Sequence, residues 1–108
     1  MKKITRQIKI GPYMFEVKHV PDLRDEDGKK LYGRHDGTYK VIEISSRQCE
    51  DMKRETVIHE CLHAIIDVTG LDVKGLEESY VTAMSPVIMS WMRDNKKMVK
   101  WILNEDTK

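Results

Sequence analysis

The apolar residues of this chain change their spacing near Ser46, and this change constrains the fold more than any other feature. Before it, the segment YMFEVK alternates, with Phe15 and Val17 on one face and Glu16 on the other, as in a half-buried strand. After it, apolar residues recur every three or four positions, as on the buried face of a helix: Met52, Val57, Ile58, Cys61, Leu62, Ile65 and Val68. Strands therefore precede helices, which predicts a small α+β domain.

Turn and cap signals give approximate bounds for these elements. Asp27-Gly28 and Asp36-Gly37 favour turns, and the second predicts a hairpin whose later arm is VIEIS. Ser45 or Ser46 is suited to cap the first helix, and Gly70 is suited to end it.

Two further helices are expected, over residues 76–94 and over residues 98–103. The spacing of apolar residues predicts that the first of them buries one stripe, made of Val81, Met84, Ile88 and Trp91.

Composition and charge describe an ordinary globular chain, which we expect to form one domain over residues 1–108. Hydrophobic residues make up 40%, charged residues 34%, and the formal net charge is +1. This balance gives no reason to expect a nucleic acid or a membrane surface as a partner. No apolar run follows the N-terminal lysines, and none approaches the roughly 18 residues of a membrane span. We therefore expect a cytoplasmic protein.

The motif HECLH lies inside the first predicted helix and carries the most specific chemical pattern of the chain. His59 and His63 are four residues apart, so both imidazoles project from one helix face and can bind one zinc ion. Glu60 would lie beside such an ion, where it can accept a proton from a metal-activated water. Because so short a pattern also occurs by chance, a helix with two incidental histidines is the alternative interpretation.

A zinc site of this kind needs a third protein ligand. The arrangement with a glycine and a third histidine after the motif is excluded, because Ile66 and Thr69 occupy those positions. The next predicted helix supplies Glu77 and Glu78, and an antiparallel return after Gly70 would bring both back over the first helix. Either carboxylate could bind the metal, and the other would then be a first-turn acid that favours the helix dipole.

Four other polar residues receive ordinary structural interpretations. His19 and His35 lie in the strand half and are expected to be exposed, although His35 with Asp36 could reach toward the site. Asp67, four residues after His63, could orient a histidine, but a solvent-facing carboxylate is favoured. Tyr80 could donate to an oxyanion, but a partly buried helix residue is favoured. The residues therefore suggest no stabiliser of a transition state apart from the metal.

HECLHAI, the glycine at position 70, LEE and MRDN together resemble the small zinc metallopeptidase-like proteins of phages and prophages. These proteins are similar to minimal gluzincins of the ImmA/IrrE and SprT-like type. The resemblance covers about residues 31–101 and is sharp only in HECLH. It implies a minimal zincin-like domain, in which a small N-terminal sheet precedes an active-site helix and one or two further helices.

The resemblance also implies roles for individual residues. It makes His59 and His63 zinc ligands and Glu60 the general base, and the register of RDN puts the third ligand on Glu78, with Glu77 in reserve. It further implies that the strand over residues 41–44, which begins at Val41 and reaches Ile44, is an edge strand on which a peptide substrate could pair. The expected location becomes the cytoplasm of a bacterial host or of a phage-infected cell.

Two functions of different classes follow. The first is a zinc-dependent metallopeptidase, which hydrolyses a peptide bond with metal-activated water and with Glu60 as general base. The second is a zinc-binding regulatory or structural phage protein with little or no proteolytic activity, which the short chain and the absence of an evident second lobe suggest. The sequence carries no signal for an oligomeric state.

Overall fold

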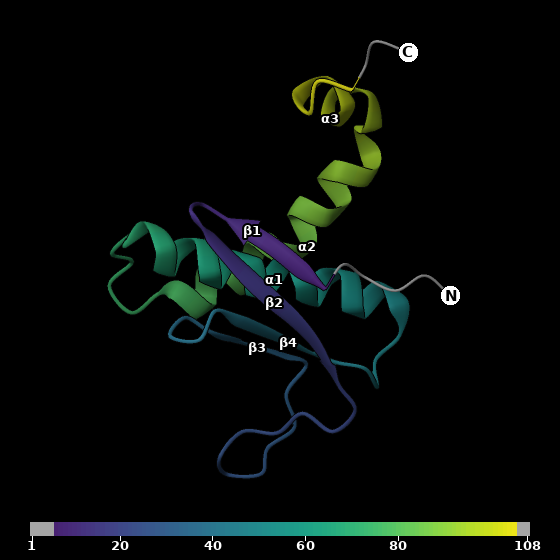
Figure 1. Cartoon of the computed structure of the whole chain (residues 1–108). Helices are drawn as coiled ribbons and strands as arrows, with labels where there is room; N and C mark the ends of the chain where they lie inside the picture. Colours follow the sequence, from purple (N-terminus) through teal and green to yellow (C-terminus); the bar gives the residue numbers. More distant parts are fainter. Residues whose placement is uncertain (1–5, 106–108) are drawn as a thin grey trace.

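A computed structural model describes residues 6–105, so the N-terminal lysines that entered the prediction of location lie outside the described residues. Four strands and three helices follow one another in the predicted order, which confirms the α+β class (Figure 1). The strands are β1 (Gln7–Ile10), β2 (Tyr13–Val20), β3 (Gly33–Asp36) and β4 (Val41–Ser45). The helices are α1 (Glu50–Thr69), α2 (Glu77–Asp94) and α3 (Lys96–Ile102). Within residues 6–105 no helix has both the length and the apolarity needed to cross a membrane.

The strands form one mixed sheet in the order β1-β2-β4-β3. β1 and β3 pair antiparallel with their neighbours, whereas β2 and β4 pair in parallel. The expectation that VIEIS is an edge strand is therefore wrong, because β4 is paired on both sides. The fully buried Ile42 and Ile44 agree with this central position, since both pack in the core with Ala64 of α1. The free edge next to the helices belongs to β3.

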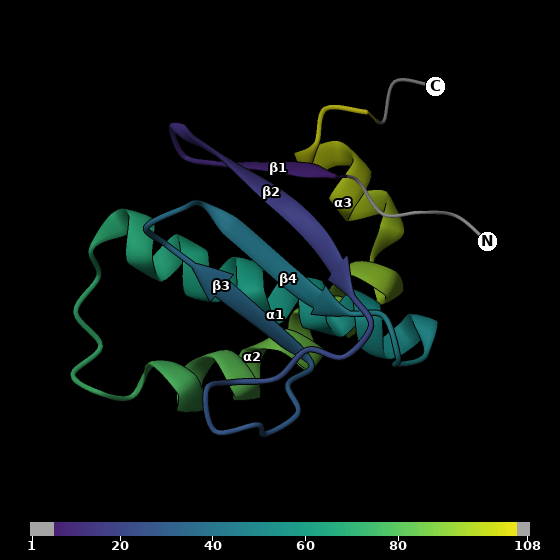
Figure 2. The same ribbon diagram turned by 60° about the horizontal axis from the view of Figure 1, so that its bottom comes forward.

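Helix α1 covers one face of the sheet, as Figure 2 shows, and the core lies between them. Ala64 of α1 packs with side chains of three strands, among them the fully buried Phe15 and Ile42. Gly33 allows the close approach of β3, because a Cβ atom there would lie 2.6 Å from Cγ2 of Thr56. The opposite face carries polar pairs such as Arg34 and Glu43, whose ion pair is 2.7 Å long.

The C-terminal end of α1 was predicted correctly, whereas the residue that caps its N-terminal end was not. Gly70 ends the helix as expected, with a φ of 69° and its N–H donating to the carbonyls of Ile66 and Asp67. The start is different, because Cys49 occupies the N-cap and makes no capping hydrogen bond with its side chain. Ser45 cannot cap α1 because it is the last residue of β4, paired with Val20 of β2.

Helix α2 has nearly the predicted bounds and continues through Pro86, but it buries a different stripe. Its buried residues are Val81 and Ser85, whereas Met84 and Trp91 remain 48% and 46% exposed. The prediction of a buried stripe through Met84 and Trp91 is therefore wrong. The C-terminal half of α2 rises away from the sheet and carries α3 at its end (Figure 1).

Candidate metal centre

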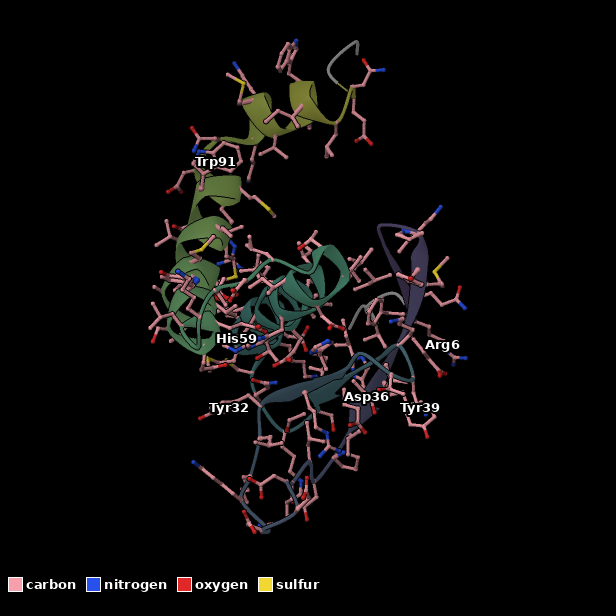
Figure 3. The ribbon with its side chains drawn as sticks, turned by 90° about the vertical axis from the view of Figure 1, so that its left-hand side faces the viewer. Arg6, Tyr32, Asp36, Tyr39, His59 and Trp91 are labelled. Carbon is pink, nitrogen blue, oxygen red and sulfur yellow. The ribbon has the colours of Figure 1, made fainter. Side chains whose placement is uncertain are left out.

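The two helices place the predicted ligands opposite one another. On α1, the rings of His59 and His63 lie 5.0 Å apart, inclined by 61°. The chain turns at Gly70, and α2 then runs back along α1, so that its first turn faces His63 while Arg93 near its end reaches Asp51 at 3.0 Å. Figure 3 shows His59 on the side where α1 faces α2.

The carboxylate of Glu78 lies against both histidines. Its Oε1 is 2.8 Å from Nε2 of His63, and its Oε2 is 3.4 Å from Nε2 of His59. One donor atom from each of these three residues lies within 4.8 Å of the other two. The three side chains therefore form a group that is close enough to hold a metal ion.

Glu77 contacts the other nitrogen of the same ring. Its Oε2 lies 2.6 Å from Nδ1 of His63. In the protonated ring, Nδ1–H donates to Glu77 and Nε2–H donates to Glu78, and loss of the Nε2 proton would free that lone pair for a metal ion. The two glutamates that the sequence left as alternatives thus occupy different positions, with Glu78 among the possible donors and Glu77 behind the His63 ring.

These donors are of the types that zinc binds. Zinc takes histidine nitrogens and carboxylate oxygens at about 2.0–2.2 Å, and tetrahedral geometry then separates its ligands by about 3.3 Å. The distances from Glu78 to the two Nε2 atoms lie on either side of that separation. Two protein nitrogens and one protein oxygen also leave a fourth position open, as in catalytic zinc sites.

Glu60 is buried next to this group. It is 6% exposed, and a Cβ atom on Gly33 would lie 3.0 Å from its Oε2, so the strand backbone covers the carboxylate. Burial is the main cause that raises the pKa of Glu60 to about 7; the charge of Glu78 raises it further and that of His63 opposes the rise. A carboxylate with such a pKa can both accept and release a proton near neutral pH.

The two histidines experience different electrostatic surroundings. Burial lowers the pKa of His59. Burial also acts to lower the pKa of His63, but the hydrogen bond to Glu77 and the negative charges of Glu60 and Glu78 outweigh it, so the pKa of His63 is raised. Of the two histidines, His63 is therefore the one that holds a proton more strongly.

His35 lies beside the centre, contrary to the expectation of an exposed strand residue. Its side chain is 18% exposed, and its ring is stacked on that of His63 at a centroid distance of 6.3 Å. Its Nε2 is buried without a hydrogen-bond partner among the described residues and lies 3.5 Å from Oδ2 of Asp67. Gly37 makes room for this pair, since a Cβ there would lie 2.1 Å from the same oxygen.

In the sequence, the pattern Gly33–His35–Gly37 could have predicted that His35 packs closely on α1. Alternate residues of a strand share one face, so one large side chain between two glycines indicates close contact with another element. The side chain of Asp67 is 48% exposed, as expected of a solvent-facing carboxylate, and the histidine that it contacts is His35 rather than His63.

His19 and Tyr80 are not part of the metal group. His19 lies in β2, in register with Ile44 of β4, and is exposed. Tyr80 is 47% exposed on α2. Comparison of the chain with protein-family profiles, with curated proteins and with solved structures returned no match.

Proposed function

We propose that this chain is a zinc-dependent metallopeptidase with a minimal zincin-like fold. The observation that carries the proposal is the convergence of His59, His63 and Glu78, with the buried Glu60 beside them. A zinc ion held by these three residues would supply a Lewis acid and lower the pKa of its water toward about 7.

The residues of the chain would transfer the proton and hold the metal ligands in position. Glu60 accepts a proton from the attacking water and then delivers it to the leaving amine, so its carboxyl returns to its starting form. The burial that raises the pKa of Glu60 favours its protonated form, so it helps the carboxylate to take the proton. Glu77 holds the ring of His63 through Nδ1. Histidine ligands held in this way keep their tautomer and orientation.

The free edge of β3 is the better place for a peptide substrate than β4. β3 pairs only with β4, and its Gly33 packs against Glu60. An extended peptide that added to this edge would run past the general base. The peptide substrate would therefore pair with β3, and not with the strand over residues 41–44.

A zinc-binding protein with little proteolytic activity is the second candidate, and the shape of the surface favours it. Among the described residues, two of the pockets, of about 410 and 240 Å³, lie beside His35 and beside Tyr32. Neither is lined by a metal donor or by Glu60. Peptidases need a cleft that positions substrate at the reacting atoms.

Metal analysis followed by digestion of a peptide library separates the two candidates. We expect one zinc per chain in the wild type and in Glu60→Gln, and none in His63→Ala. Hydrolysis should be lost in Glu60→Gln but kept in Glu26→Gln, which makes the same change in an exposed loop. Bound zinc without Glu60-dependent cleavage of any peptide would reject the peptidase and leave the second candidate.

A further inference from the structure

Helix α2 carries a second apolar stripe that its own chain leaves uncovered. Tyr80, Met84, Val87 and Trp91 are 47%, 48%, 65% and 46% exposed. At 3.6 residues per turn they form one line along the helix, about a quarter turn from the buried Val81. Figures 1 and 3 show that the end of α2 at Trp91 stands clear of the sheet.

The spacing of this stripe fits another helix. The four positions are separated by four, three and four residues. An alternation of four and three is the spacing by which two helices interlock along a shallow crossing. An extended strand or a flat surface would not match it.

The stripe is symmetric about its own midpoint, which lies between Ser85 and Pro86. Two copies of α2 that pack antiparallel about that point place Tyr80 opposite Trp91 of the second copy. They also place Met84 opposite Val87 of the second copy. A self-complementary surface of this kind is what a two-fold symmetric pair requires.

The charges near the C-terminal end of α2 favour the antiparallel orientation. At the N-terminal end Glu77 and Glu78 are already engaged by His63 and His59, and Asp72 and Lys74 cancel. The C-terminal end stays basic once Arg93 is paired with Asp51, because Lys96, Lys97 and Lys100 outnumber Asp94 and Glu105. Parallel copies bring the two basic ends together, whereas antiparallel copies keep them apart.

Exposed apolar residues also lie at both ends and would extend the contact. Leu71 and Leu76 precede α2 and are 61% and 48% exposed, while Met98 and Trp101 of α3 are 53% and 64% exposed. We propose that the chain forms a two-fold dimer in which the stripe of Tyr80, Met84, Val87 and Trp91 packs antiparallel against the same stripe of a second copy.

Sedimentation equilibrium of the full chain tests the partner. We expect a dimer dissociation constant below about 100 μM, as for a weak but specific interface. Val87→Glu places a charge at the centre of the stripe and should raise the dimer dissociation constant at least about tenfold. Because Val87 is 65% exposed, the monomer should keep its circular dichroism and its melting temperature. Ser90→Glu, which adds the same charge on another exposed face of α2, should leave the dissociation constant within about threefold.

Cross-linking tests the orientation. The background is Cys49→Ser, which removes the exposed native thiol. In it, Met84→Cys chains and Val87→Cys chains are oxidised each alone and also as an equimolar mixture. An antiparallel pair predicts disulfides between positions 84 and 87 in the mixture only. A chain that stays monomeric at about 100 μM, links of 84 to 84 or 87 to 87, or equal effects of Val87→Glu and Ser90→Glu would each overturn the proposal.

Discussion

At the scale of single residues, the two neighbouring glutamates of α2 differ in what they contact. Glu78 touches both Nε2 atoms, whereas Glu77 touches Nδ1 of His63 alone. We expect Glu77→Ala to lower zinc affinity by about 10–100-fold, the usual effect of removing a partner behind a ligand histidine. Competition with a chromogenic chelator measures this. Glu77→Gln, which can still accept a hydrogen bond, should lose less.

The control for this change is Ser79→Ala, an exposed position in the same helical turn. It should leave the zinc affinity unchanged. If Glu77→Ala abolished stoichiometric zinc while Glu78→Ala kept it, the roles of the two carboxylates would be reversed.

The protonation of His63 predicts how metal affinity depends on pH. Burial lowers its pKa, but the hydrogen bond to Glu77 and the charges of Glu60 and Glu78 raise it by more, so the net shift is upward. Zinc binds the unprotonated ring, so protons compete with the metal below that raised pKa. Zinc affinity should therefore rise with pH. As pH falls, the affinity should begin to weaken while the pH is still above 6.5, the ordinary pKa of histidine. Chelator competition from about pH 5 to 8 measures it, and a flat profile would contradict it.

At the scale of elements, the contact between β3 and α1 depends on Gly33. A Cβ atom there would lie 2.6 Å from Cγ2 of Thr56. Gly33→Ala should therefore lower the free energy of unfolding by about 1–3 kcal/mol, as overpacking of a tight contact does. Denaturant titration measures it. Thr56→Ser removes only the clashing methyl group, so the double variant should recover part of the loss; no recovery would show that the contact lies elsewhere.

The helices were more predictable than the sheet because their signals are local. Gly70 and the first-turn acids of α2 set helix ends within a few residues of themselves. The position of β4 between β2 and β3 was missed because strand pairing is non-local, and a run such as VIEIS suits a central strand as well as an edge.

In the metal group and in the apolar stripes of α2, local features could likewise be predicted and non-local contacts could not. HECLH revealed His59, Glu60 and His63, because a helix fixes the relation between residues four apart. His35 was missed because its contact with α1 depends on the register of β3. Periodicity also showed that α2 has apolar faces, but it could not show which one α1 covers.

At the scale of the whole molecule, bound metal should add a large share of the stability. Zinc at about 100 times its dissociation constant stabilises a folded protein by about 2.7 kcal/mol. For a domain of this size that corresponds to a rise in melting temperature of about 10–20 °C. Scanning calorimetry with zinc and with excess chelator measures the difference. His63→Ala should show none, and an equal rise in that variant would mean that the ion binds elsewhere.

The three donors of the candidate centre, from His59 to Glu78, all belong to one helix–turn–helix segment. Bringing the ends of so short a segment together requires little loop-closure entropy. The cover over Glu60 is different, because Gly33 comes from the strand half of the chain and is held in place by the antiparallel pairing of β3 with β4. During folding, the ability to capture a metal should thus arise early and locally. The ability to use that metal should arise only after the β3–β4 hairpin has formed and has packed on α1.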